Sequence, residues 1–173
     1  MKRLLLFLAC CVAPAAQAAD PTAPVDEIMQ EAVRGWAEEP QPGEDYFSEA
    51  RLRRIYSEDF ADSYRAAAKF PAYDEGDSPF SYDVIAGGQD GCAFRDLAVV
   101  AGPETDSATD VTVTFDNTHC FGERAADWKP AELHFMVIDE NDRPVIDDIV
   151  RAGEVGSVKA ELEGIASQGV GDQ

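Results

Sequence analysis

The fold is decided by CAFRDLAVVA, residues 92–101, and VTVTFDNTHC, residues 111–120. Both segments are rich in β-branched and aromatic residues, and the turn-forming segment GPETDS, residues 102–107, separates them, so they predict a β-hairpin. A register that places Cys92 opposite Cys120 also pairs three sets of apolar residues: Leu97 with Phe115, Val99 with Val113, and Ala101 with Val111. A slip by one residue would place a threonine opposite Val99, so the pattern favours this register.

The same register predicts a disulfide between Cys92 and Cys120. It would close a loop of about 30 residues and stabilise the domain by roughly 3–4 kcal/mol in the chain-entropy model. The alternative is a redox or metal site. The sequence offers little for it, because there is no C-x-x-C motif and only His119 stands beside Cys120.

A second hairpin and several helices surround this first hairpin. Leu133–Ile138 and Val145–Val150 are another pair of β-rich runs, around the turn segment ENDR, residues 140–143. Apolar residues at helical spacing predict four helices, at residues 25–36, 48–56, 57–70 and 157–166, the last three with N-cap serines 48, 57 and 157. Helices followed by a four-stranded antiparallel meander predict an α+β fold with helices on one sheet face.

The first 18 residues have the form of a secretory signal peptide. Two basic residues precede the apolar run LLLFLACCV, residues 4–12, and AQA, residues 16–18, is a small-residue cleavage site. The run is too short for a membrane-spanning helix, which needs roughly 20 apolar residues. We therefore expect export to the periplasm, where cysteines meet an oxidising environment. The alternative is a lipid-anchored form that is acylated at Cys10 or Cys11.

We expect one globular domain in the mature chain. Cleavage after Ala18 leaves 155 of the 173 residues, which is enough to bury a sizeable core. Residues 19–43 are expected to form an N-terminal helix and linker, residues 44–166 the domain, and residues 167–173 a disordered tail.

The chain is strongly acidic, with 34 Asp and Glu against 14 Lys and Arg and a net charge of −20. The first 18 residues hold two positive charges and no acid, so the mature net charge is −22. One interpretation is solubility alone. The other is a cationic partner, such as a basic protein, because an acidic field attracts basic molecules and repels nucleic acid and anionic lipid.

The segment DVIAGGQD, residues 83–90, resembles the Asp-Pro-x-x-x-x-Gln-Asp segment of a family of bacterial envelope proteins known as domain of unknown function 3828. Val84 stands where that family has proline. The resemblance covers roughly residues 44–166 and includes the closing strand PVIDDI, residues 144–149. It implies an envelope location and a nuclear transport factor 2-like fold, in which a curved sheet wraps around helices as a cone. It implies no reaction, because that family has no established one, and the fold alone does not decide function, since it hosts enzymes and binders alike.

Tyr82, Asp83, Gln89 and Asp90 flank the glycine pair at residues 87–88 and are candidate binding residues. One interpretation is a recognition loop. The other is a turn, in which an aspartate accepts hydrogen bonds from local backbone N–H groups and the glycines supply positive φ angles.

His134 and Asp147 are the candidate catalytic pair. The second predicted hairpin pairs Met136 with Asp147, and His134 with Ile149. His134 and Asp147 then lie diagonally on one sheet face, where a carboxylate can orient an imidazole as a base. The alternative is two polar groups on a partly solvated face. Asp148 is expected to point away from Asp147, because neighbouring strand residues face opposite sides.

Other charged motifs carry weaker functional interpretations. Arg51, Arg53 and Arg54 are the only basic cluster and are expected to pair with nearby acids on a helix surface, with an anionic ligand as the alternative. The segment DEGD, residues 74–77, superficially resembles a calcium loop but lacks its twelve-residue ligand spacing. No phosphate loop, dinucleotide fingerprint or zinc motif is present, and no cofactor is predicted. Both tryptophans are expected to pack in the core or at its rim and not to serve as a ligand platform.

Three function hypotheses follow from these patterns. The first is a non-catalytic binding module for a cationic protein, such as a toxin or an envelope enzyme. The second is a small hydrolase or isomerase that uses His134 and Asp147 in the mouth of the cone. The third is a carrier that holds a small molecule in an apolar cone interior.

Overall fold

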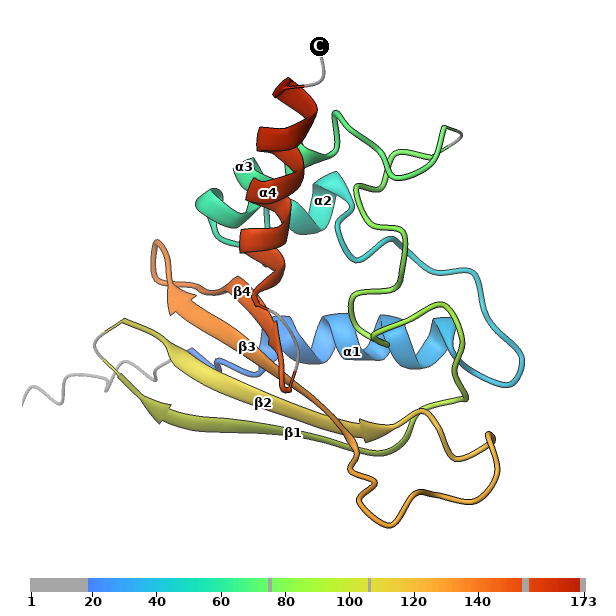
Figure 1. The fold of residues 1–173 in the computed structure, drawn as a ribbon. Coiled ribbons are helices and arrows are strands. Elements are labelled where there is room, and N and C mark those ends of the chain that lie inside the picture. Colours follow the sequence, from blue (N-terminus) through green and yellow to red (C-terminus); the bar gives the residue numbers. More distant parts are fainter. Residues whose placement is uncertain (1–18, 75, 106, 154–155, 172–173) are drawn as a thin grey trace, which may run out of the picture.

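The computed structural model describes residues 19–74, 76–105, 107–153 and 156–171, and Figure 1 shows its ribbon. Three helices come first, four strands follow, and a further helix closes the chain: α1 (Ala23–Gly35), α2 (Glu49–Leu52), α3 (Glu58–Ala67), β1 (Arg95–Glu104), β2 (Thr109–Asp116), β3 (Ala131–Asp139), β4 (Pro144–Arg151) and α4 (Val158–Gly171). The signal peptide expected at residues 1–18 lies outside the described residues.

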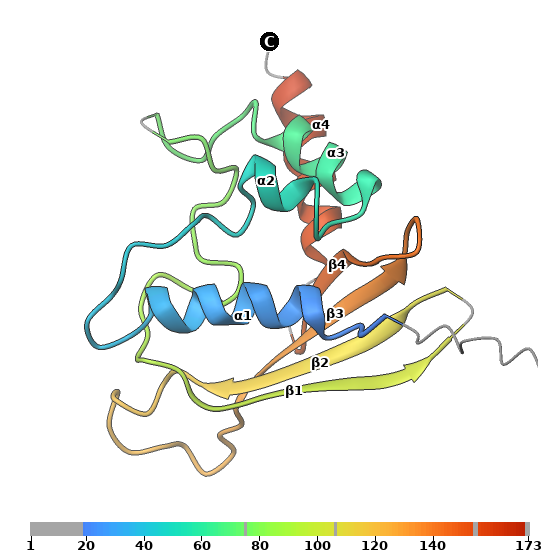
Figure 2. The same ribbon diagram turned by 180° about the vertical axis from the view of Figure 1, so that it is seen from behind.

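The strands form one open antiparallel sheet in the order β1-β2-β3-β4. The helices lie on one side of it, with α1 along the sheet and α2, α3 and α4 gathered near β4 (Figures 1 and 2). The prediction of an α+β fold with a four-stranded antiparallel sheet is confirmed. No described helix covers the other side, which we call the open face. Its outward-facing residues include Ala98, Val100, Asp110, Thr112, Thr114, Glu132, His134, Met136 and Val150.

The core lies between the sheet and the helices. On β2, Val111, Val113 and Phe115 are fully buried, because alternate side chains of a strand point to the same face. α1 contributes four buried apolar residues at helical spacing: Val25, Ile28, Met29 and Ala32. This helix therefore shares a core with the rest of the chain, and the expected division at residue 44 does not mark a boundary in the packing.

The predicted helix starts are confirmed. The side chains of Ser48, Ser57 and Ser157 accept hydrogen bonds from the N–H groups of residues 51, 60 and 160. The predicted ends differ. α2 stops at Leu52, because the following backbone joins the free edge of β4, where Ile55 and Ser57 hydrogen-bond with Ile146. α4 continues to Gly171, so the tail expected to be disordered from residue 167 is helical up to that residue.

The first hairpin has the predicted register over its centre. Val99 pairs with Val113, and Ala101 with Val111. The predicted pair of Leu97 with Phe115 is wrong, because the register shifts between Arg95 and Ala98, where Asp96 has a φ of 53°. The bulge leaves Leu97 39% exposed and lets the ring of Phe94 stack on that of Phe115, with centroids 4.2 Å apart.

The predicted disulfide between Cys92 and Cys120 is confirmed, with Cα atoms 5.9 Å apart. It lies just beyond the paired parts of β1 and β2, where the Cys92 N–H donates to the Asn117 carbonyl at 2.8 Å. The bond therefore joins the two chain segments at the open end of the hairpin. No described helix is long and apolar enough to cross a membrane.

Candidate functional site

A bulge in β4 separates the candidate catalytic residues. Near the turn, Val137 pairs with Ile146 as predicted, but Met136 pairs with Asp148, so Asp147 is the extra residue between these pairs. His134 consequently pairs with Val150 and not with Ile149. The predicted diagonal relation between His134 and Asp147 is therefore wrong. An insertion of one residue shifts every pair beyond it, and nothing in the alternation of apolar residues marked its position.

His134 lies instead between two carboxylates on the open face. Its Nδ1 is 3.0 Å from Asp110 Oδ2 on β2, and its Nε2 is 3.3 Å from Glu132 Oε1 on β3. The side chains of Asp110 and Glu132 are 45% and 44% exposed, so this cluster is accessible to solvent. Sequence reasoning missed both carboxylates. The β2–β3 register, which sets Thr112 opposite His134, would have found them.

Asp147 belongs to a polar cluster on the helical side. It accepts hydrogen bonds from Ser57 Oγ at 2.7 Å and from Lys159 Nζ at 2.8 Å, and Lys159 Nζ also donates to Asp59 at 3.0 Å. Burial disfavours the charged form of Lys159, but its bonds to Asp147 and Asp59 outweigh this, so its pKa is raised. Asp148 Oδ1 accepts the backbone N–H of Lys159 at 3.0 Å. These groups join α3 and α4 to β4, and Asp147 is bonded to Ser57 and Lys159 and not to His134.

Asp83 is the centre of a turn that ties distant segments together. Its Oδ1 accepts the N–H groups of Ile85 and Ala86 at 2.8 and 2.9 Å. Its Oδ2 accepts Trp36 Nε1 at 2.8 Å and the Tyr46 hydroxyl at 3.2 Å. Burial raises the pKa of Tyr46, and the Asp83 carboxylate raises it further, so the phenol remains a donor. All four contacts are internal, which agrees with the turn interpretation of this segment.

The other candidate binding residues do not converge with Asp83. The Tyr82 hydroxyl donates to Glu161 at 2.5 Å and accepts from Arg151 at 2.8 Å, which links the turn to α4 and β4. Gln89 donates to the Ser81 carbonyl at 2.5 Å. Asp90 is exposed. Their role in binding remains a prediction.

The arginine cluster pairs with acids, as expected, but one member is buried. Arg51 donates to Glu31 at 2.7 Å and to Glu27 at 3.0 Å, and it also reaches the carbonyls of Glu44 and Asp45 at 2.6 and 2.8 Å. The Arg51 side chain is only 5% exposed, and its hydrogen bonds hold α1 and α2 together. Arg54 makes two bonds of 2.6 Å to Glu27, and Arg53 pairs with Glu49 at 2.8 Å.

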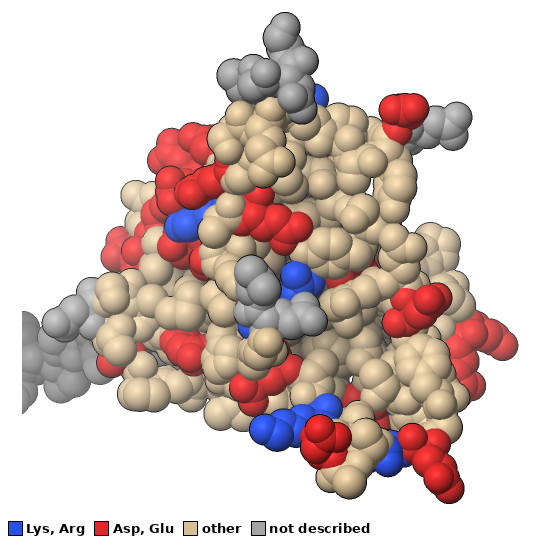
Figure 3. Space-filling view, in the orientation of Figure 1, with Lys and Arg blue, Asp and Glu red and all other residues tan. Residues whose placement is uncertain are grey.

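Many of the described basic side chains are paired with carboxylates of the same chain, mostly at the surface. Seven of them each contact at least one carboxylate within 4 Å: Arg34, Arg51, Arg53, Arg54, Arg65, Arg124 and Lys159. Red carboxylates accordingly outnumber blue basic groups on the face shown in Figure 3. The surface field is therefore strongly negative.

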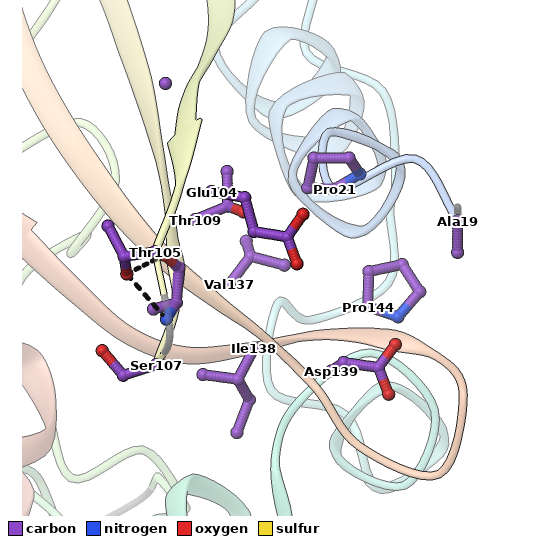
Figure 4. A pocket seen from close by; sticks show the side chains of 12 residues that line it. Ala19, Pro21, Glu104, Thr105, Ser107, Thr109, Val137, Ile138, Asp139 and Pro144 are labelled. Carbon is purple, nitrogen blue, oxygen red and sulfur yellow. Dashed lines mark hydrogen bonds between the residues drawn. The ribbon is translucent and has the colours of Figure 1, made fainter. Parts of the chain in front are cut away.

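Two surface pockets adjoin the sheet. One has a volume of about 440 Å³, lies at the turn end, and is lined by Ala19, Pro21, Glu104, Asp139 and Pro144, among others (Figure 4). The other has a volume of about 550 Å³, lies beside the disulfide, and is lined by Trp36, Cys92, Cys120 and His119, among others. Trp36 also stacks on Phe94 and therefore packs at the rim of the core, as expected.

Among the described residues, no group of three or more His, Cys, Asp or Glu could hold a metal ion. The acidic segment at residues 74–77 includes residue 75, which lies outside the described part of the chain. Comparisons with protein-family models, curated proteins and solved structures found no match. Fold and site together define an α+β domain whose sheet has one helix-covered face and one open, acidic face.

Proposed function

We propose that this protein is a non-catalytic binding module that captures a basic protein on the open face of its sheet. The observation that supports this proposal is the negative charge of that face. On β2 and β3 its outward positions include Asp110 and Glu132, whereas no lysine or arginine occupies an outward position on β2, β3 or β4.

The open face offers both negative charge, which attracts a cationic partner, and apolar area, on which that partner can pack. The carboxylates and the mature charge of −22 would accelerate encounter with a cationic surface, most strongly at low salt. Val100, which is 61% exposed, and the half-buried Met136 and Val150 supply apolar area for close packing. A suitable partner is a basic toxin or a basic envelope enzyme.

We further propose that the fold is a nuclear transport factor 2-like cone, that the chain resembles domain of unknown function 3828 by common descent, and that it is exported to the periplasm. The α+β architecture and the helices on one face support the first two proposals. The signal-like sequence at residues 1–18 and the Cys92–Cys120 disulfide support export, because disulfides persist in oxidising compartments.

The test is capture of basic proteins from bacterial envelope extract by the immobilised mature protein. Asp110→Asn with Glu132→Gln removes two charges from the open face. Asp62→Asn with Glu163→Gln removes two from α3 and α4 and is the matched control. We expect wild type and control to retain one basic protein at low salt, to release it at high salt, and the open-face variant to lose it. Equal retention by both variants would rule out the open face, and no retained basic protein would rule out the function.

A further inference from the structure

The pocket at the turn end of the sheet presents carboxylates and no basic group. Glu104, from the end of β1, and Asp139, from the end of β3, both face the space in Figure 4. Pro21, Val137 and Pro144 supply apolar walls. No lysine, arginine or histidine is among the described lining residues. Such a pocket suits a small cation, because the two exposed carboxylates attract positive charge and no basic group among the described lining residues opposes it.

These two carboxylates have spare acceptor capacity. The Glu104 backbone pairs with Thr109, and its carboxylate accepts no hydrogen bond from the described residues. Asp139 accepts only the Asp142 N–H at 3.1 Å, through Oδ1, so its Oδ2 remains available. A carboxylate has about four lone-pair sites, so both groups have room for an additional donor.

The chain is anchored at Asp20, directly after Ala19, which lines this pocket. Asp20 Oδ1 accepts the N–H and the hydroxyl of Thr22, both at 3.0 Å, and the Asp20 carbonyl accepts the Ala23 N–H at 3.2 Å. These bonds anchor the turn that leads into α1. Ala19, directly before this anchored turn, is also the residue that would follow the predicted cleavage site, AQA at residues 16–18.

We propose that this pocket binds the ammonium group that signal-peptide cleavage creates on Ala19. Hydrolysis of the bond between Ala18 and Ala19 adds one water, leaving a carboxylate on the released segment and an amine on Ala19 that is protonated at neutral pH. The inference rests on the proposed export. Cleavage then adds a charged contact between the start of the chain and the ends of β1 and β3.

The helix dipole is the main opposing effect. The positive end of α1 lies four residues beyond Ala19 and disfavours a cation near it. Asp20 and Asp26 lie at this end and act against that field, and both are engaged with Thr22. Glu104 and Asp139 therefore remain for the ammonium, and two nearby carboxylates outweigh a partial charge.

The experiment is a titration of the α-amino group by ¹⁵N NMR in protein that begins at Ala19. An ordinary α-amino group has a pKa of about 7.7–8.0. We expect a pKa clearly above this range in the wild type and a return to it in Glu104→Gln with Asp139→Asn. Glu58→Gln with Asp62→Asn, on α3, is the matched control and is expected to keep the raised pKa.

An ordinary pKa in the folded wild type, or a raised pKa that survives loss of Glu104 and Asp139, would overturn the proposal. A lysine side chain from a partner is the other source of the same chemistry. It predicts an ordinary amine pKa together with carboxylate shifts of residues 104 and 139 on addition of butylammonium. The mass of protein recovered from the periplasm reports separately on cleavage after Ala18, so failure of export and failure of the pocket are distinguishable.

Discussion

The Arg51 guanidinium donates to the Glu31 carboxylate at 2.7 Å, and the two side chains are only 5% and 7% exposed. This contact joins α2 to α1 inside the fold. Removing two charges from water is costly, and the cost is offset here because Arg51 also bonds with Glu27 and with two backbone carbonyls. The pair therefore specifies how α1 docks.

Glu31→Gln should lower the free energy of unfolding by about 3 kcal/mol, because it leaves a buried guanidinium without its closest counter-charge. Urea unfolding measures the change. Arg53→Gln breaks a pair whose side chains are 65% and 52% exposed and should cost less than about 1 kcal/mol. Similar losses in the two variants would contradict a special role for the buried pair.

Glu27 should make stability depend on pH. Its hydrogen bond with Arg54, helped by Arg51 and opposed by burial, lowers its pKa below the ordinary 4.5. A carboxylate with a lowered folded pKa contributes stability above its unfolded pKa, and that contribution is lost as the pH falls through the folded pKa. Glu27→Gln should therefore show a smaller loss of stability than wild type between about pH 6 and pH 3 in urea unfolding. Parallel pH profiles would contradict this.

Replacing Cys92 and Cys120 together by alanine should destabilise the domain by about 3 kcal/mol, because the bond spans a sequence separation of 28 residues. Thermal unfolding of the double variant measures the loss. Wild type treated with a thiol reductant is the control and should match the variant. An unchanged melting temperature would show that the bond does not constrain the unfolded chain.

Asp83→Ala should destabilise the domain by about 2–3 kcal/mol, because four donors lose a charged acceptor. In a Trp128→Phe background Trp36 is the only tryptophan. Its emission should shift to longer wavelength as its indole loses its anchor. Asp90→Ala, in the same loop but exposed, should change stability by less than about 0.5 kcal/mol.

Double-mutant cycles should show which partner Asp147 has. Ser57→Ala and Asp147→Ala should couple by about 0.5–3 kcal/mol, since the two side chains are 2.7 Å apart. His134→Ala and Asp147→Ala should be additive, because the bulge separates them. Coupling of His134 with Asp147 would contradict the observed register.

Local patterns were enough to predict much of the fold. Alternating apolar residues predicted both hairpins, and serines before helical runs predicted three helix starts, because strand alternation and helix capping are properties of a few neighbouring residues. The cysteine spacing predicted the disulfide. The acidic composition was equally plain from the sequence, but where the charges lie was not.

What the sequence by itself determined is therefore the set of elements, their order and the net charge. Tertiary structure decided the candidate site. Single-residue bulges beside Asp96 and at Asp147 changed which residues pair across the strands. One extra residue disturbs the alternation of apolar residues too little for its position to be recognised in the sequence. Contacts such as Trp36 with Asp83 and Lys159 with Asp147 join residues far apart in the chain, and only the packing of helices against the sheet brings them together.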